Sequence, residues 1–516
     1  MALPIRKFPI GIEDFEQLRT CDFLYVDKTD LVYQMANGNT TCFLSRPRRF
    51  GKSLLISTLE AYFMGKKHLF EGLAIERLEK EWTVHPVLNI SFSRRHYEEA
   101  DDLWRLLNEQ LNEWETLYGK AGTDDSLGGR FEAVIRQAYQ QTGQRVVVLV
   151  DEYDSPLLDA TGNDALRTEL RKMTRGFFSP LKNNTKLLRF LFLTGITKFS
   201  PMSIFSELNS LDDISMWQQY NNVCGITEAE LIRDFKPDIE ALAANNDETY
   251  EQALAHLKRL YDGYLFNPRG ENIYNPFSLI NVLKKWEYGT YWFSTGTPTF
   301  LVELLRKRNM PLMELEGSKA LAAAFDKSTD TLTDPIPVLY QSGYLTIKDF
   351  QNGVYTLGYP NEEVRYGFLN SLLPSFMGYS QMENDMSVIA MKEALDTGDI
   401  DGCLKRLRSF VASIPYEKKS DNESRFETIF YLIFTLMGQL TRTQVKTSAG
   451  RVDVLVANQR YVYLFELKVD ATPEEAMAQI DEKGYAIPYE ADARTIVKVG
   501  VSYDSQTRGI AGWKVG

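Results

Sequence analysis

The sequence of 516 residues predicts a protein of the α/β class, and three observations lead to that prediction. Four short apolar runs occur early in the chain, and near-continuous apolar runs are typical of strands buried on both faces of a parallel sheet. Patterns with helical spacing separate these runs, so strands and helices alternate. A shorter α-β-β-α-β pattern closes the chain. The four apolar runs are Thr41–Leu44, Val87–Phe92, Arg145–Asp151 and Arg189–Gly195.

The first helix between these strands is predicted directly after the first apolar run. Leu55, Leu59, Tyr62 and Phe63 recur at the spacing of one helix face, and Gly65 is a suitable terminator. Residues 1–225 are therefore predicted to form one layered α/β domain with a parallel sheet.

Residues 226–380 have a different pattern, and a chain of this length is expected to contain two to four domains. Thr227 and Glu230 have the spacing of a capping box, and several helical patterns follow. Asn352-Gly353 lies between two short predicted strands, which predicts a hairpin. Helices followed by a hairpin favour a winged-helix-like region, although a helical spacer with an incidental hairpin explains the pattern equally well. Residues 381–516 form the predicted third domain.

Composition excludes several classes of protein. A net charge of −12 argues against a constitutive, charge-driven nucleic-acid binder, but not against a locally contacted nucleic-acid substrate. The chain has no apolar run of about 18 residues or more, which argues against a membrane protein, and its start does not resemble a secretory signal. Four scattered cysteines without CxxC spacing argue against disulfides and a Cys/His zinc site. We expect a cytoplasmic protein.

A nucleotide-binding loop is predicted after the first strand. Gly51, Lys52 and Ser53 form the second half of the pattern G-x-x-x-x-G-K-[ST]. In such loops backbone N–H groups and the lysine contact phosphates, and the Ser/Thr hydroxyl binds magnesium. Arg46 occupies the place of the first glycine.

Polar residues at two later strand ends complete this predicted site. Asp151-Glu152 follows a fully apolar strand, where one carboxylate would join Ser53 in the magnesium shell and the second would polarise the attacking water. Thr194 ends a further strand and is a candidate sensor of the γ-phosphate, with Lys198 nearby. The predicted cofactors are ATP and Mg²⁺, and Glu152 is the predicted catalytic residue.

The order of these motifs resembles the AAA-ATPase-like family of bacterial proteins. The resemblance covers about residues 5–280 and rests on seven blocks in order: FPIGIEDFEQL, YVDKTDLV, SRPRRFGKSLLISTL, VVVLVDEYDSPL, FLTGITKFS, SIFSELN and YDGYLF…YNPFSL. It implies that the segment with Tyr25, Asp27 and Lys28 lies near the nucleotide.

The arginine-rich loop is the usual form in that family, so the resemblance implies that Arg46 is a family trait. Arg46, Arg48 and Arg49 add positive charge beside the predicted phosphates. We predict that Arg46 and Arg49 bind the nucleotide, and that one of the three clamps a phosphate or reaches the nucleotide of a neighbouring subunit in a homo-oligomer.

A second predicted site lies near the C-terminus. Glu466 and Lys468 alternate along one strand and therefore share a face, and antiparallel pairing with the preceding strand brings Asp453 close to Glu466. Two neighbouring carboxylates repel unless a cation lies between them, and Mg²⁺ or Mn²⁺ suits oxygen ligands. The lysine would orient or deprotonate an attacking water.

This pattern resembles the PD-(D/E)xK nuclease superfamily from about residue 422 to 513. The resemblance implies a further metal ligand on the preceding helix, either Glu423 or Glu427, with Glu423 favoured. It also implies three residues that face the site by analogy: Gln479, Lys483 and Tyr485.

Two functional hypotheses follow. The first is an ATP-hydrolysing protein coupled to a metal-dependent nuclease domain that cleaves DNA or RNA. In the second, a regulatory ATPase of the STAND type carries a C-terminal domain that is a non-cleaving adaptor. A non-enzymatic scaffold is disfavoured because both sites keep complete sets of acidic and lysine residues.

Overall fold

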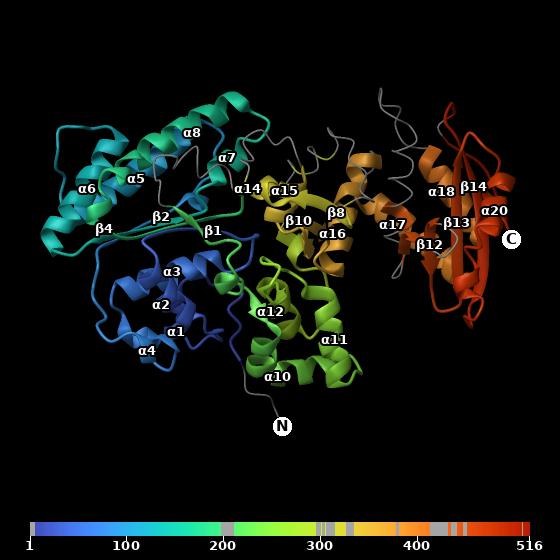
Figure 1. Cartoon of the computed structure of the whole chain (residues 1–516), viewed down its shortest axis with the longest axis horizontal. Helices are drawn as coiled ribbons and strands as arrows, with labels where there is room; N and C mark the ends of the chain where they lie inside the picture. The colour runs from blue at the N-terminus through green and yellow to red at the C-terminus, as the bar shows by residue number, and fades with distance from the viewer. Residues whose placement is uncertain are drawn as a thin grey trace. The chain divides into compact units, whose positions relative to one another are not determined.

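The computed structural model describes most of the chain, and these residues form two compact units (Figure 1). One unit comprises Met1–Thr295 and Gly317–Val364, and the other comprises Gly296–Glu316 and Arg365–Gly516. The described residues are 6–197, 211–295, 301, 305, 315–326, 335–377, 381–412, 432–434, 441–446, 451–507 and 509–516.

A parallel sheet forms the centre of the first unit, in the order β2-β3-β4-β1-β5. Its strands are β1 (Thr41–Ser45), β2 (Val87–Ser91), β3 (Val146–Asp151), β4 (Leu188–Gly195) and β5 (Asp212–Asp213). Every residue of β1 and β3 is buried, as expected for strands covered on both faces. The four predicted strands are confirmed. The short edge strand β5 was not predicted, because two aspartates carry no apolar signal.

Helices cover both faces of this sheet (Figure 1). They are α1 (Phe15–Thr20), α2 (Thr29–Gly38), α3 (Lys52–Phe63), α4 (Ile75–Leu78), α5 (Ala100–Tyr118), α6 (Leu127–Thr142), α7 (Ser155–Asp159) and α8 (Asp164–Phe178). Helix α3 packs against β2 and β3 beside α1 and α2, whereas α5, α6 and α8 pack together. The architecture is therefore the predicted α/β layering.

The helical region of the same unit follows the sheet. It contains α10 (Glu228–Asn245), α11 (Tyr250–Tyr261), α12 (Pro276–Lys285) and the short antiparallel pair β6 (Ile226–Thr227) and β7 (Ile273–Tyr274). Thr227 and Glu230 form the predicted capping box of α10. The region shares one compact unit with the sheet, so the predicted boundary at residue 225 marks a change of architecture within that unit.

The predicted hairpin is present and belongs to a small three-stranded sheet, β8-β10-β9. Asn352 and Gly353 both have positive φ angles, 52° and 80°, as a tight two-residue hairpin turn requires. The sequence did not predict β8, which is short and distant in sequence. The elements here are β8 (Ser318–Leu321), α14 (Ala322–Asp326), α15 (Pro335–Gln341), β9 (Thr346–Gln351) and β10 (Val354–Gly358).

The second unit contains a mixed sheet in the order β11-β12-β13-β14-β15, in which β13 and β14 are parallel and the other pairs antiparallel. Helix α20 packs on β13 and β14. The elements are α16 (Glu362–Met377), which begins in the first unit, α17 (Gln381–Thr397), α18 (Ile400–Ala412), β11 (Thr441–Lys446), β12 (Arg451–Ala457), β13 (Tyr461–Val469), α20 (Pro473–Glu482), β14 (Thr495–Asp504) and β15 (Gly509–Val515). The sequence predicted β12, β13, α20 and β14.

Two further expectations concern the whole chain. Within the described ranges, no helix combines the length and apolar character that crossing a bilayer requires. The four cysteines are free, and all except Cys21 are buried.

Candidate nucleotide and metal sites

The predicted phosphate-binding loop lies between the end of β1 and the start of α3. Gly51 is the N-cap of α3 and has a φ angle of 92°, a left-handed conformation that favours glycine. Lys52 is only 4% exposed, and its Nζ donates hydrogen bonds of 3.0 Å to the carbonyl oxygens of Arg46 and Pro47. The lysine ammonium is therefore held against the loop that precedes it, at the positive end of a helix.

The carboxyl end of β3 meets this loop. Asp151 is 4% exposed, and burial raises its pKa to about 6, while a hydrogen bond with Ser53 and the charge of Lys52 act in the opposite direction. The structure thus brings Lys52, Ser53 and Asp151 together, from segments about 100 residues apart in the sequence. A bound cation would relieve the burial of this carboxylate.

Three buried oxygen atoms lie at the ends of β3 and β4 without a hydrogen-bond partner in the described part of the chain. They belong to Asp151 (Oδ1), Asp154 (Oδ1) and Thr194 (Oγ1). A buried polar atom that lacks a partner typically costs about 1–3 kcal/mol, so such atoms are usually satisfied by water, an ion or a ligand. Carboxylate and hydroxyl oxygens suit hydrated Mg²⁺, so Asp151 and Ser53 fit this cation, whereas Oδ1 of Asp154 lies against Gly195 and the ring of Tyr153.

Glu152 has an unusual backbone conformation. Its φ angle is 50°, which is uncommon for a residue other than glycine, and its side chain is half-buried. Backbone strain of this kind concentrates at functional sites. Glu152 lies directly after Asp151, where the sequence predicts a residue that orients water.

The second unit brings three residues together beside the buried carboxylate of Glu466. Glu466 on β13 is 1% exposed, and its Oε1 accepts a hydrogen bond from Gln479 of α20. The Nζ of Lys468 lies 3.6 Å from the same oxygen. Gln479 also lies 3.5 Å from the hydroxyl of Tyr485. The predicted Glu-x-Lys pair is therefore on one face, with two of the three residues implied by resemblance beside it.

The other predicted members of this site are described less completely. Val454 of β12 pairs with Phe465 of β13 in antiparallel register, and the same register extended by one residue sets the backbone of Asp453 opposite Glu466. Lys483 is exposed at the end of α20. Glu423 and Glu427 lie outside the described residues. Among the side chains that are described, no group of three or more His, Cys, Asp or Glu residues forms a metal site.

Comparisons with known proteins identify a family over each of the two regions that hold these residues. A family described as "Predicted AAA-ATPase" matches residues 9–205, and the "PD-(D/E)XK nuclease superfamily" matches residues 421–513. An uncharacterized protein in the vnfD 5' region of Azotobacter chroococcum mcd 1 is 38% identical over 533 residues, which cover 99% of each chain. The chain belongs to the AAA-ATPase-like family with a C-terminal PD-(D/E)XK nuclease superfamily domain. The two recognised resemblances are confirmed.

Arg46 of this AAA-ATPase-like protein does not contact the phosphate region in the way predicted. It is 1% exposed, and its Nη1 and Nη2 donate to the carbonyl oxygens of Ser45, Ser215 and Tyr220 at 2.7–2.8 Å. Its guanidinium lies 4.1 Å from the ring centre of Phe266. Because these groups occupy Nη1 and Nη2, and only Nε lacks a partner among the described residues, we correct the prediction and assign Arg46 to the support of the loop.

Arg49, by contrast, is partly exposed beside the loop. Its side chain is 40% exposed, and its Nη1 is 4.0 Å from Glu13. Its guanidinium lies 5.2 Å from the ring centre of Phe277 on α12. Glu13 also raises the pKa of Asp151 through its charge, although less than burial does, so Glu13 lies close to the loop and the end of β3. A weak, solvent-exposed ion pair of this kind is readily exchanged for a phosphate.

The helical region and the segment before β9 both pack on the loop of the AAA-ATPase-like domain. Trp292 Nε1 donates a 3.2 Å hydrogen bond to the carbonyl oxygen of Arg48. A Cβ atom added to Gly343 would lie 2.6 Å from the Cβ of Pro47, so these residues are in close contact. The ring centre of Phe50 lies 4.8 Å from that of Tyr264 and 5.6 Å from that of Phe266. Each residue from Arg46 to Phe50 therefore contacts a residue beyond position 200.

An apolar cavity of about 100 Å³ lies beside the loop. Gly51 and Leu54 line one side, and Pro276 and Ile280 of α12 line another. The remaining wall comes from the N-terminal segment that includes Tyr25 and Lys28, together with residues 223–226. The exposed surface of the cavity is mainly apolar, which suits a flat aromatic ring attached to groups held by the loop.

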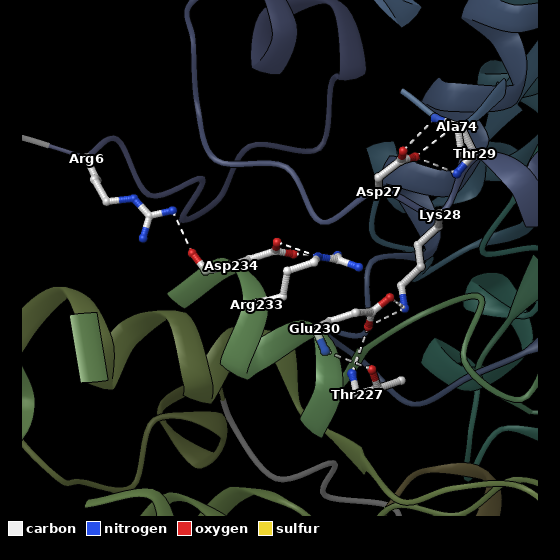
Figure 2. Close-up of polar contacts among 9 residues, drawn as sticks. All are labelled: Arg6, Asp27, Lys28, Thr29, Ala74, Thr227, Glu230, Arg233 and Asp234. Atoms are coloured by element: carbon white, nitrogen blue, oxygen red, sulfur yellow. Dashed lines mark hydrogen bonds and ion pairs between the residues drawn. The ribbon is translucent and has the colours of Figure 1, made fainter. Parts of the chain in front are cut away.

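Figure 2 shows how the N-terminal segment is held against α10. The Nζ of Lys28 donates to both carboxylate oxygens of Glu230 at 2.6 Å, and both side chains are largely buried. Asp27 accepts hydrogen bonds from Thr29 and from the backbone amide of Ala74, at 2.7–2.9 Å. The segment implied by resemblance therefore borders the apolar cavity, and its two charged residues are engaged with protein groups.

The sequence motifs did not predict the buried carboxylate of Asp154 or the ion pair of Lys28 with Glu230. The unpartnered carboxylate oxygen of Asp154 belongs to the sequence DEYD, but only the first two residues of that block carried a chemical expectation. Glu230, the partner of Lys28, lies about 200 residues away in the sequence. The capping-box spacing predicted that Glu230 begins a helix but did not indicate an ion pair.

Proposed function

We propose that the first unit binds and hydrolyses ATP at the loop between β1 and α3. The observation that carries this proposal is the meeting of Ser53 and Asp151 beside Lys52, with unpartnered buried oxygens on Asp151 and Thr194. Lys52 would leave the carbonyl oxygens of the loop for the β- and γ-phosphates. Glu152 would orient the attacking water and accept its proton. Magnesium held by Ser53 and Asp151 would neutralise phosphate charge when bound.

The adenine base would occupy the apolar cavity beside the loop. Its walls include residues from the N-terminal segment, the loop and α12, so a bound base would contact three parts of the unit. Arg49 would exchange Glu13 for a phosphate, or would reach the nucleotide of a neighbouring subunit if the protein is a homo-oligomer.

The proposed position of the adenine base in the apolar cavity can be tested by a substitution. Ile280→Arg should fill the cavity with a long charged side chain and weaken ATP binding by about tenfold or more, which corresponds to about 1.4 kcal/mol. Titration with a fluorescent ATP analogue measures this. Ile232→Arg is the matched control, because Ile232 is 41% exposed on α10 and does not line the cavity. If Ile280→Arg binds the ATP analogue as tightly as wild type does, adenine does not occupy this cavity.

Nucleotide binding would be transmitted through the contacts of residues 46–50 with the helical region. Any movement of these residues around a triphosphate must displace Trp292, Tyr264 or Phe266, because close-packed groups do not move independently. This supports the hypothesis that ATP rearranges the helical region and thereby controls the rest of the chain.

For the second unit we propose metal-dependent cleavage of a phosphodiester in DNA or RNA. Buried Glu466 with Lys468 at 3.6 Å carries this proposal, and Asp453, with Glu423, would complete the ligands of Mg²⁺ or Mn²⁺. Lys468 would orient the attacking water and stabilise the negative charge that develops on the phosphoryl oxygens. A cytoplasmic location, in agreement with four free cysteines, is part of the same proposal.

The proposal is tested by incubating purified protein with linear, circular and single-stranded nucleic acids, with and without ATP and Mn²⁺. Phosphate release and strand cleavage are measured in the same samples. ATP turnover without cleavage of any substrate would favour the adaptor hypothesis for the second unit. Absence of both activities would contradict both proposals.

A further inference from the structure

Asp154 is a buried carboxylate that joins two catalytic strand ends. It follows β3 by three residues and is 1% exposed. Its Oδ2 accepts hydrogen bonds from the backbone amides of Ile196 and Thr197, at 3.0 and 2.7 Å, and from the Thr197 hydroxyl at 2.7 Å. One carboxylate oxygen thus receives three donors from the segment that follows β4.

The neighbouring tyrosine strengthens the same connection. The amide of Tyr153 donates to the carbonyl oxygen of Thr194 at 3.2 Å, and its hydroxyl donates to the carbonyl oxygen of Thr197 at 2.9 Å. The segment after β3, which begins with Glu152, is therefore joined by several hydrogen bonds to the end of β4 and the residues that follow it. A displacement of one segment must move the other.

The second carboxylate oxygen of Asp154 has little space around it. A Cβ atom added to Gly195 would lie 2.5 Å from this Oδ1, nearer than real Cβ contacts, and 2.8 Å from the ring of Tyr153. Oδ1 has no hydrogen-bond partner among the residues described. Glycine at position 195 thus permits the close approach of Asp154 to β4.

We propose that Asp154 is a positioning residue for ATP hydrolysis. It fixes the distance between Glu152, which orients the water, and Thr194, which faces the γ-phosphate, by holding the segment after β4 against the segment after β3. The inference rests on the proposed ATPase function and adds a residue that touches neither nucleotide nor metal. Lys52 and Glu152 both lie near enough for their charges to act on Asp154, and burial raises its pKa.

The test uses steady-state ATP hydrolysis by the full chain, with ATP affinity measured separately. Asp154→Ala removes all three accepted hydrogen bonds, and kcat should fall by about 10- to 100-fold, as expected for a misplacement of about 1 Å, while ATP affinity stays unchanged. Asp154→Asn should restore most of kcat, because the amide oxygen can accept the same three donors and its NH₂ group replaces the unpartnered oxygen.

Gly195→Ala approaches the same contact from the opposite side. This variant keeps the carboxylate of Asp154 but displaces it from β4, because the new Cβ would lie 2.5 Å from its Oδ1. It should therefore lower kcat as Asp154→Ala does and leave the ATP affinity unchanged. Asp262→Ala is the matched control for loss of a buried carboxylate, since Asp262 also has a buried Oδ1 without a partner in the described residues and lies outside the loop. It should keep the wild-type kcat.

Three results would overturn the inference. The first is a wild-type kcat in Asp154→Ala or in Gly195→Ala. The second is an Asp154→Asn variant as slow as Asp154→Ala, which would mean that the negative charge acts directly. The third is a parallel loss of ATP affinity and kcat, which would indicate general unfolding. If the wild-type protein itself binds or hydrolyses no ATP, the proposed function fails, and this inference fails with it.

Discussion

Lys52→Ala should reduce ATP turnover by at least about 100-fold, comparable to the loss of an electrostatic donor in other active sites. Lys52 is a buried cation of the predicted phosphate-binding loop, and its ammonium is held by the carbonyl oxygens of Arg46 and Pro47. A triphosphate would replace these two acceptors with charged oxygens, which form stronger hydrogen bonds. Alanine removes the charge and leaves two carbonyl oxygens without their donor.

Phosphate release measures this effect, with thermal unfolding as a check that the variant folds. Lys67→Ala is the matched control, because Lys67 is exposed shortly after the end of α3 and should keep wild-type turnover. Turnover by Lys52→Ala at the wild-type rate would show that the loop after β1 is not the nucleotide site.

Glu466→Gln should reduce the rate of metal-dependent cleavage more than about 100-fold, because the loss of a group that only orients a metal ligand already costs about 10- to 100-fold. Glu466 is buried, accepts a hydrogen bond from Gln479 and lies 3.6 Å from the ammonium of Lys468. An amide keeps the size of the side chain but removes the charge that would hold a divalent cation. ATP turnover should remain unchanged, because the two sites lie in different compact units.

A nuclease assay with Mn²⁺ and the thermal shift caused by Mn²⁺ measure the two consequences. Glu474→Gln is the control, since the side chain of Glu474 is 63% exposed on the same unit and should behave as wild type. A metal-induced shift that survives in Glu466→Gln would place the cation elsewhere. No shift in the wild-type protein would favour a non-cleaving adaptor.

Strands and their carboxyl ends could be predicted from sequence because they depend on local pattern. The apolar runs of β1 and β3 are buried throughout, and β4 is buried except at Arg189. Parallel strands bring their carboxyl ends to one edge of the sheet, so Asp151 and Ser53 met as expected. Strand β13 was predicted for the same reason. The edge strands β5 and β8 have too few apolar residues to give a signal.

The roles of individual charged residues depended on tertiary packing and were harder to predict. An arginine in a loop resembles a phosphate ligand until its partners are known, and the partners of Arg46 come from residues about 170 positions away. The connection of Asp154 with Thr197 depends likewise on two strands that are distant in sequence. In the second unit, the predicted ligand Glu423 lies outside the described residues, so its role stays a prediction.

The central claim is that Asp151 and Ser53 hold the magnesium of a bound nucleotide, and the pH dependence of binding tests it most directly. Burial raises the pKa of Asp151 to about 6, so this carboxylate is charged above that pH and protonated below it. A proton competes with a metal for the carboxylate.

The measurement is the affinity for Mg²⁺·ATP at about pH 8 and at about pH 5, two conditions on either side of this pKa, in wild type and in Asp151→Asn. We predict that binding to wild type weakens by about tenfold at the lower pH. Asp151→Asn should bind weakly at both, with the small residual pH dependence of the nucleotide itself. If Asp151→Asn binds Mg²⁺·ATP as tightly as wild type at both pH values, the account of this site is wrong.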